Sequence, residues 1–149
     1  MAYLIDTSVL VRLGNSLDPQ QALALRAISK LGVQGETLYI TAQSLIEFRS
    51  VATRPAQNNG LGFTPSAAAR EAANFEAVFP LLPDTPAIYP AWKSLADTVG
   101  ASGKQVHDTR LAAVCHVYHV THILTFNVRD FLRFQGVGPG LIVVDPNTV

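Results

Sequence analysis

The chain has 149 residues, of which 48% are hydrophobic and 15% are charged, and its eleven acidic and eleven basic side chains cancel. This composition excludes an intrinsically disordered protein, and no apolar run reaches the length of about 18 residues that a membrane-spanning helix needs. Balanced charge also argues against binding of nucleic acid through a broad basic surface, although it leaves room for a nuclease with a local basic region.

The first predicted element is a short strand over Ala2–Ile5, followed by a turn at Asp6, Thr7 and Ser8 and a short helix through Leu10–Leu13. In an open parallel sheet, the carboxyl ends of the strands face the crevice in which ligands bind. Asp6 is therefore a helix cap or a metal ligand, and Ser8 at the helix start suits a phosphate oxygen.

A helix and a second strand follow. Asp18 and Pro19 have the residue types of a helix N-cap and first helical position, and Gly32 is placed to end that helix. Leu38–Ile40 is a short apolar run that predicts the second strand.

The next predicted helix runs from a cap at Thr41 toward Arg54 and carries Glu47 at the margin of its apolar face. A solvent-exposed glutamate is the more common reading of such a residue alone. Glu47 becomes a candidate ligand only in the company of other acids.

The middle of the chain contains predicted helices, a strand and a loop, but no candidate site residue. Its elements are a loop over 55–64, a helix capped by Thr64 that runs to about Val78, a strand at Leu81–Leu82, and a helix over Ala91–Val99 that ends at Gly100.

The helix predicted over Val106–Tyr118 carries Asp108 in its first turn, where capping or pairing with the helix dipole is worth about 0.3–1 kcal/mol. Arg110 either pairs with an acid, which we favour, or contacts a phosphate. Cys115 lies on the apolar face of this helix and is the only cysteine, so no internal disulfide can form. We therefore expect a reducing, cytoplasmic setting.

The last predicted elements are a strand over His122–Thr125, a one-turn helix and a strand over Leu141–Val144. Asn127 and Asp130 follow the first of these strands. Together with Thr125 they form the densest group of oxygen donors that follows any strand in the chain.

Strands and helices alternate along the chain, which favours an α/β fold with a parallel sheet and helices on both faces. We expect one domain over residues 1–149. Acids gathered in the crevice of such a sheet would repel one another unless a cation lay among them. Oxygen ligands favour Mg²⁺ or Mn²⁺ over zinc, and metal-assisted hydrolysis of a phosphodiester is the reaction that fits such a site best.

The chain resembles PIN-domain proteins, most of all the toxin ribonucleases of VapBC toxin–antitoxin pairs. The resemblance covers nearly the full length and rests on four features in matching order and spacing. These are the segment Tyr3–Ser8, Glu47, the segment His107–Arg110, and the segment Leu124–Phe131. It implies a three-layer α/β/α PIN-like domain with a central parallel sheet, usually a homodimer. It also implies a Mg²⁺- or Mn²⁺-dependent endoribonuclease, inhibited by a cognate antitoxin whose tail enters the active site.

Carried over to this sequence, the resemblance implies that Asp6, Glu47 and Asp108 are the core metal ligands and catalytic acids. Many PIN domains have Asp where this chain has Asn127, which is neutral and a weaker ligand. Asp130, three residues further on, is the other candidate for the fourth position. We expect three further residues to contact the substrate: Ser8, Arg110 and Thr125.

Two other readings remain. Asp6 could be the covalent nucleophile of a phosphatase, but such sites want a second Asp two residues on, and this chain has Ser8 there. The chain could instead be a non-catalytic PIN-fold module that binds RNA or protein, and Asn127 is the only residue that favours this. With RNA and an antitoxin as the expected partners, we expect no membrane association.

Overall fold

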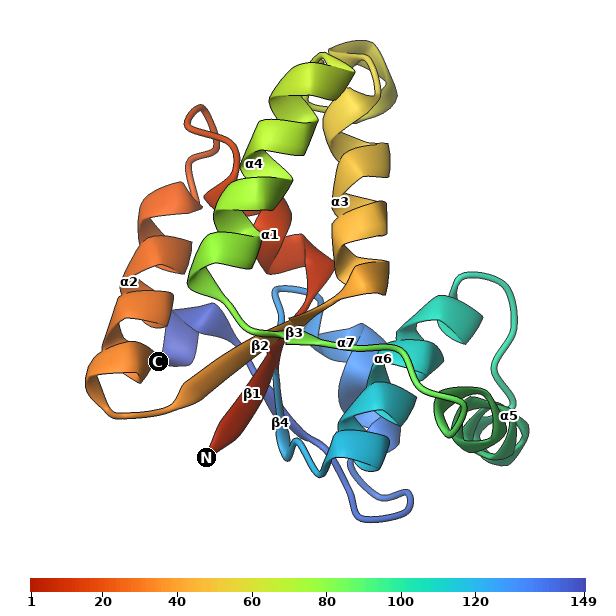
Figure 1. The fold of residues 1–149 in the computed structure, drawn as a ribbon. Coiled ribbons are helices and arrows are strands. Elements are labelled where there is room, and N and C mark those ends of the chain that lie inside the picture. The colour runs from red at the N-terminus through yellow and green to blue at the C-terminus, as the bar shows by residue number, and fades with distance from the viewer.

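The computed structural model describes residues 1–149, and its centre is a sheet of five strands in the order β3-β2-β1-β4-β5 (Figure 1). All four neighbouring strand pairs are parallel, which confirms the predicted parallel sheet. The strands are β1 (Ala2–Ile5), β2 (Thr37–Thr41), β3 (Leu81–Leu82), β4 (His122–Leu124) and β5 (Ile142–Val144).

Helices cover both faces of this sheet, and the three-layer α/β/α prediction is confirmed. One face carries α1 (Thr7–Leu13), α2 (Gln21–Val33), α3 (Ala42–Thr53) and α4 (Pro65–Val78). The other carries α5 (Ile88–Val99), α6 (Gln105–Tyr118) and α7 (Val128–Phe131). No helix is long and apolar enough to cross a membrane.

The two layers follow from the alternation of side chains along β1. Tyr3 and Ile5 belong to the core beneath α1–α4, whereas Leu4 between them belongs to the core beneath α5 and α6. Each core contains 14 buried residues. A strand that is buried on both faces is typical of a parallel sheet sandwiched between helices.

The predicted start of the second helix is wrong. The helix α2 begins at Gln21, and its N-cap residue makes no side-chain capping bond. Asp18 instead accepts a hydrogen bond from the backbone N–H of Gln20, two residues on, which closes a turn before the helix. Short polar side chains favour such turns as strongly as they favour helix caps.

The predicted end of α2 at Gly32 is also wrong, because the helix continues to Val33. The glycine that ends it is Gly35, in the left-handed region at φ +80°. The N–H of Glu36 then bonds to the carbonyl of Leu31 at 3.0 Å, which is the closing bond of a Schellman motif.

Two predicted helix starts are confirmed. The Thr41 and Thr64 hydroxyl oxygens cap α3 and α4 by accepting bonds from Ser44 N–H and Ala67 N–H. Thr41 is also the last residue of β2, so the strand passes directly into the helix that carries Glu47. By contrast, α5 begins three residues earlier than predicted, at Ile88.

Candidate active site

The order of the strands creates a crevice between β1 and β4. The chain builds β2 and β3 on one side of β1 and then returns to place β4 on the other side. Ligands of open α/β sheets bind at such a reversal, beyond the carboxyl ends of the strands. Asp6 and Thr125 each directly follow one of these strands, so the fold brings together residues that lie 119 positions apart.

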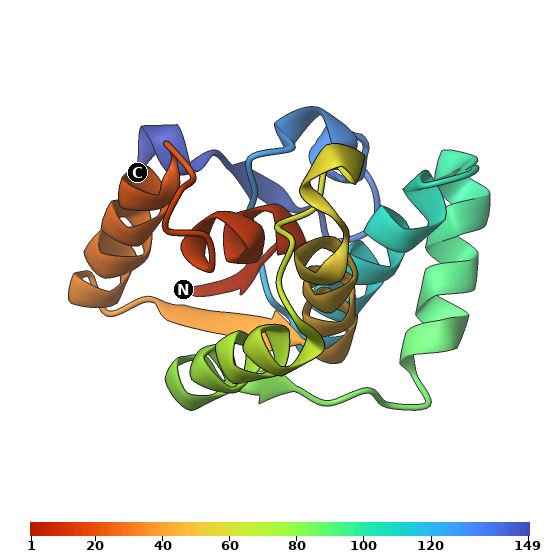
Figure 2. The same ribbon diagram turned by 90° about the horizontal axis from the view of Figure 1, so that it is seen from above.

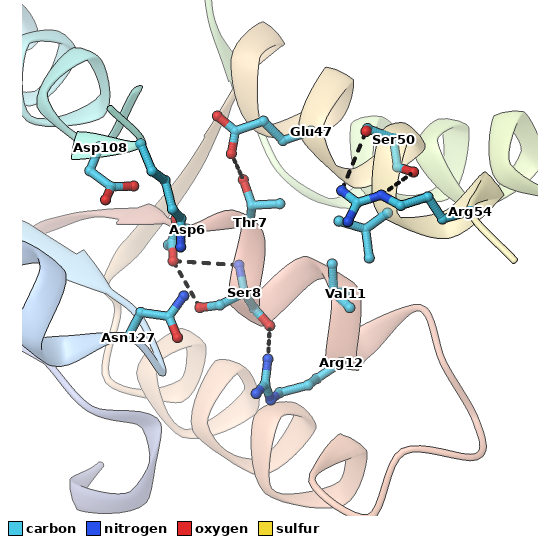
Figure 3. Close-up of a pocket in the computed structure, with 12 residues that line it drawn as sticks. Asp6, Thr7, Ser8, Val11, Arg12, Glu47, Ser50, Arg54, Asp108 and Asn127 are labelled. Atoms are coloured by element: carbon cyan, nitrogen blue, oxygen red, sulfur yellow. Dashed lines mark hydrogen bonds between the residues drawn. The ribbon is translucent and has the colours of Figure 1, made fainter. Parts of the chain in front are cut away.

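A cavity of about 530 Å³ opens at this end of the sheet (Figure 3). Most of its wall comes from α1 and from the second half of α3, with contributions from the start of α6 and the segment after β4. The residues that line it are Asp6, Thr7, Ser8, Val11, Arg12, Glu47, Ser50, Val51, Arg54, Lys104, Asp108 and Asn127.

Asp6 is both the N-cap of α1 and a wall of the cavity. Its Oδ2 atom accepts bonds from the Ser8 hydroxyl at 2.8 Å and the Thr125 hydroxyl at 2.7 Å, together with a longer bond from Ser8 N–H. All of these bonds go to Oδ2, which leaves Oδ1 without a protein partner. Only 4% of Asp6 is exposed, and this burial raises the pKa of its carboxyl group in spite of the hydroxyl donors.

Glu47 is held in place by donors from two helices. The Thr7 hydroxyl of α1 donates to Glu47 Oε2 at 2.9 Å, and the Gln43 amide, one turn earlier on α3, donates to Oε1 at 2.7 Å. The Gln43 amide also donates to the His107 carbonyl at the start of α6, at 2.8 Å. Glu47 therefore lies where α1, α3 and α6 meet.

The pKa of the Asp108 carboxyl group responds to the other acids of the site. Burial raises the pKa of its carboxyl group to about 6, and repulsion by Asp6 and Asp130 adds to this effect. The ammonium group of Lys104 opposes the shift, and repulsion by Glu47 reinforces it. Helix capping alone would stabilise the charged form of Asp108, so the raised pKa reflects its burial first and the neighbouring carboxylates second.

Asn127 and Asp130 take different places. Asn127 lies at the start of α7 and lines the cavity beside Asp6, as Figure 3 shows. Asp130 is not among the lining residues, and its carboxylate faces Lys104 Nζ at 3.7 Å. It acts on Asp108 through its charge.

Of the three residues expected to contact substrate, only Ser8 lines the cavity. Thr125 is fully buried and lies behind the wall, where its hydroxyl donates to Asp6 and accepts from Asn127 N–H at 2.9 Å. Arg110 forms the ion pair that we favoured, with Asp84 at 3.1 Å, and also donates to Gln43 at 3.2 Å.

Sequence reasoning missed five residues of the cavity that bear polar or charged groups. They are Thr7, Arg12, Ser50, Arg54 and Lys104. Helical spacing could have found two of them, because Arg12 lies four residues after Ser8 and Arg54 lies seven after Glu47, on the same helix faces. Lys104 precedes α6, and nothing in its loop indicated a role.

The donor chemistry of the cavity fits a hard divalent cation. Asp6, Glu47 and Asp108 offer carboxylate oxygens and Asn127 adds an amide oxygen, with no thiolate or imidazole beside them. No three acids, histidines or cysteines in the chain lie close enough to form a finished metal-binding cluster. The carboxylates would therefore have to move closer together to share an ion, which is consistent with their mutual repulsion.

Known proteins share this fold. The family model described as PIN domain matches residues 3–137. A comparison with curated protein sequences found no match.

Solved structures of several bacterial proteins have a similar fold. VapBC2 from Rickettsia felis, bound to a promoter DNA fragment, superposes with a TM-score of 0.71 at 15% identity, over 97% of this chain and 98% of that one. VapBC-1 from nontypeable Haemophilus influenzae gives a TM-score of 0.70 at 17% identity, over 98% of both chains. Mycobacterium tuberculosis VapC20, a Sarcin-Ricin loop cleaving toxin, gives 0.59 at 19% identity, over 81% of this chain and 86% of that one.

Proposed function

The chain belongs to the PIN-domain family, and we propose that it is a divalent-metal-dependent endoribonuclease that hydrolyses RNA phosphodiester bonds. The observation that carries this proposal is the convergence of Asp6, Glu47 and Asp108, from three separate elements, on one polar cavity. The raised pKa of Asp108 supports their mutual interaction.

We assign the metal to Asp6, Glu47 and Asp108, with Asn127 completing the ligand set. Asp130 is the second choice for the fourth position, because its carboxylate is close enough to influence Asp108 but is not on the cavity wall. Mg²⁺ or Mn²⁺, when bound, would supply a Lewis acid that polarises the phosphodiester and lowers the pKa of water.

The chain's own residues orient these ligands. The hydroxyl groups of Ser8 and Thr125 hold Asp6 through Oδ2 and leave Oδ1 without a protein partner. The hydroxyl of Thr7 and the amide of Gln43 hold the two oxygens of Glu47. Such outer partners fix the direction in which a carboxylate presents its free lone pairs.

The structural relatives suggest a biological role. VapC20 is a toxin that cleaves the Sarcin-Ricin loop, and VapBC2 and VapBC-1 are toxin–antitoxin complexes. By analogy, this chain would be the toxin of a type II toxin–antitoxin pair, active in the cytoplasm as a homodimer and inhibited by a cognate antitoxin. This part of the proposal rests on the likeness of the fold.

The test is cleavage of a structured RNA by the purified protein in the presence of Mn²⁺. We expect cleavage to stop with EDTA and to return with added Mn²⁺. The Asp6→Asn and Asp108→Asn variants should each lose activity on the order of a hundredfold or more, because each replaces an anionic ligand of the proposed metal, which stabilises the reacting centre, with a neutral amide. Asp97→Asn, on the exposed side of α5, removes an acid far from the cavity and should retain activity. Cleavage that persists in EDTA or in both site variants would contradict the proposal.

A non-catalytic role is the second candidate, and Asn127 favours it, since a neutral amide binds a metal more weakly than the carboxylate usual in the family. The same experiment separates the two candidates. Wild-type protein that binds RNA but cleaves none with Mg²⁺ or Mn²⁺ would establish the binding module.

A further inference from the structure

The cavity has two ends of opposite charge. Asp6, Glu47 and Asp108 lie at one end, near the starts of α1 and α6 and the middle of α3, and Arg12 and Arg54 lie at the other (Figure 3). Both arginines extend from the pair of helices that forms the wall, since α1 packs against α3 (Figure 2). The metal site described above uses only the acidic end.

Arg12 is held rigidly, yet by groups that carry no charge. Its Nε donates to Gln20 Oε1 at 2.7 Å, its Nη1 donates to the Ser8 carbonyl at 2.9 Å, and its guanidinium lies 4.4 Å from the centre of the Phe126 ring. A guanidinium has five N–H donors, so three remain for a ligand. The plane of Arg12 is therefore fixed in advance while most of its donors are free.

Arg54 ends α3, and a returning loop fixes its backbone. Gly62 N–H donates to the Arg54 carbonyl at 2.9 Å, and Gly60 packs so closely that an added Cβ atom would lie 2.0 Å from the same carbonyl oxygen. The side chain folds back along the helix, where its Nε and Nη2 approach Ser50. The glycine-rich loop thus secures the position from which Arg54 reaches the cavity.

Neither arginine has an acidic partner. The three ion pairs of the structure join Met1 to Glu36, Lys104 to Asp130, and Arg110 to Asp84. Two guanidinium groups without a counter-ion in one polar cavity are a site for an anion, and their planar fork matches a phosphate.

The distance between the two ends suits a single nucleic-acid strand. Arg12 lies six positions after Asp6 and Arg54 lies seven after Glu47, so the backbone of each arginine lies about 10 Å further along the chain direction than that of the acid. Both guanidinium groups reach back by one turn, to Ser8 and Ser50. A strand whose scissile phosphate lies at the acids would carry its next phosphates along the same cavity. An acidic peptide has no such regular repeat of charges.

We infer that Arg12 and Arg54 form a second phosphate subsite, which binds the RNA strand beside the bond to be cleaved and sets its direction across the metal site. This inference rests on the proposed function, since it names the part of that site which holds the substrate. It assigns the subsite a role in binding rather than in the chemical step.

The experiment measures RNA binding separately from cleavage. The Asp6→Asn protein is titrated, without divalent ions, into a short fluorescent single-stranded RNA, and anisotropy gives the dissociation constant at several salt concentrations. The substitutions Arg12→Gln and Arg54→Gln are then introduced, one at a time, into the Asp6→Asn chain. Arg26→Gln, on the exposed side of α2, is the matched control for the loss of one positive charge.

Each cavity variant should weaken binding about tenfold, which corresponds to about 1.4 kcal/mol. Each should also reduce the slope of log affinity against log salt by about 0.7, the value for one lost contact to a single-strand phosphate. Arg26→Gln should change neither. Arg12→Lys keeps the charge but not the fork, so it should recover the salt slope and only part of the affinity.

Cleavage assays with the same substitutions in the wild-type chain give an independent measure. If a residue binds a neighbouring phosphate equally in the ground and transition states, its substitution should raise KM and leave kcat nearly unchanged. Arg12 also contacts Gln20 and Phe126, so thermal unfolding is used to verify that the Arg12 variants fold. If they do not fold, the Arg54→Gln variant alone tests the inference.

Binding that is unchanged in the folded variants, or weakened equally by Arg26→Gln, would overturn the subsite. Absence of RNA binding by the Asp6→Asn protein would overturn it too. Variants that bind RNA normally but no longer bind an acidic peptide would assign the arginines to a protein partner instead. None of these outcomes decides whether the wild-type protein cleaves RNA, so the subsite and the proposed activity fail separately.

Discussion

At the scale of single residues, Asp6 shows how a structural role and a chemical role can coexist. Its Oδ2 atom caps α1 and accepts hydrogen bonds from two hydroxyl groups, while its other oxygen has no protein partner. Asn caps helices as well as Asp does, whereas Ala loses about 1 kcal/mol as an N-cap. Asp6→Asn is therefore the substitution that removes the charge and leaves the fold intact.

Asp108 yields a prediction about stability in the absence of metal. The pKa of its carboxyl group is raised to about 6 in the folded protein, so the folded state holds its proton more tightly than the unfolded chain does. The free energy of unfolding should then fall as the pH rises from about 4 to about 6, and the loss persists above that range. The full shift would correspond to about 3 kcal/mol, and solvent screening of this half-exposed group reduces it to about 1 kcal/mol.

Asp108→Asn should remove this penalty. In EDTA, we expect urea unfolding to show the variant about 1 kcal/mol more stable than wild type at pH 7 and nearly equal to it at pH 4. Asp97→Asn is the control. A variant that is less stable than wild type at pH 7, or equally stabilised at both pH values, would contradict the raised pKa of Asp108.

The sequence predicted that Asp6, Glu47 and Asp108 carry the chemistry, because the acids occur in company and match the PIN-domain pattern in order and spacing. It could not tell whether a residue faces the cavity or lies behind its wall. Thr125 and Arg110 have the right chemistry for substrate contact, yet they bond to Asp6 and to Asp84 and Gln43 instead. The direction of the side chain decides whether such a residue reaches the cavity, and the spacing of residues along the sequence does not reveal that direction.

At the scale of elements, one glutamine joins the helices of the site. The Gln43 amide donates to Glu47 and to the His107 carbonyl, and its oxygen accepts from Arg110, which is itself paired with Asp84. Gln43 is thus the link through which α6 fixes the direction of a carboxylate on α3. We regard it as a positioning residue, because it reaches the proposed metal only through Glu47.

Gln43→Met keeps the length of the side chain and removes its hydrogen bonds. We expect cleavage at limiting Mn²⁺ to fall about 10–100-fold, as is usual for the loss of an outer partner of a metal ligand, and excess Mn²⁺ to restore much of it. Gln34→Met, at the exposed end of α2, should behave like wild type. Equal loss at all Mn²⁺ concentrations would instead indicate a general structural defect.

Sequence patterns located the elements better than their ends. Thr41 and Thr64 were recognised as caps because their hydroxyl groups precede strongly helical segments. The end of α6 at Tyr118 was also predicted correctly, although His119, the residue after it, takes the left-handed conformation at φ 57° that usually selects glycine. The start differs by one residue, because α6 begins at Gln105.

At the scale of the whole molecule, the strand order explains why the site forms at all. Because the chain returns to the centre of the sheet after β3, the residues that follow β1 and β4 meet at one crevice. The alternation of strands and helices predicted the parallel sheet, but the order of its strands required the structure. The single domain, the homodimer and the antitoxin partner stay predictions.

The central claim is that Asp6, Glu47 and Asp108 together bind one kind of hard divalent cation. Calorimetric titration of the wild-type protein with Mn²⁺ tests it most directly, beside Asp6→Asn, Asp108→Asn and the distant control Asp97→Asn. We predict saturable binding by the wild-type protein and Asp97→Asn, and an affinity at least about tenfold lower for each site variant. A wild-type protein that binds no Mn²⁺, or site variants that bind it as tightly as wild type, would contradict the account.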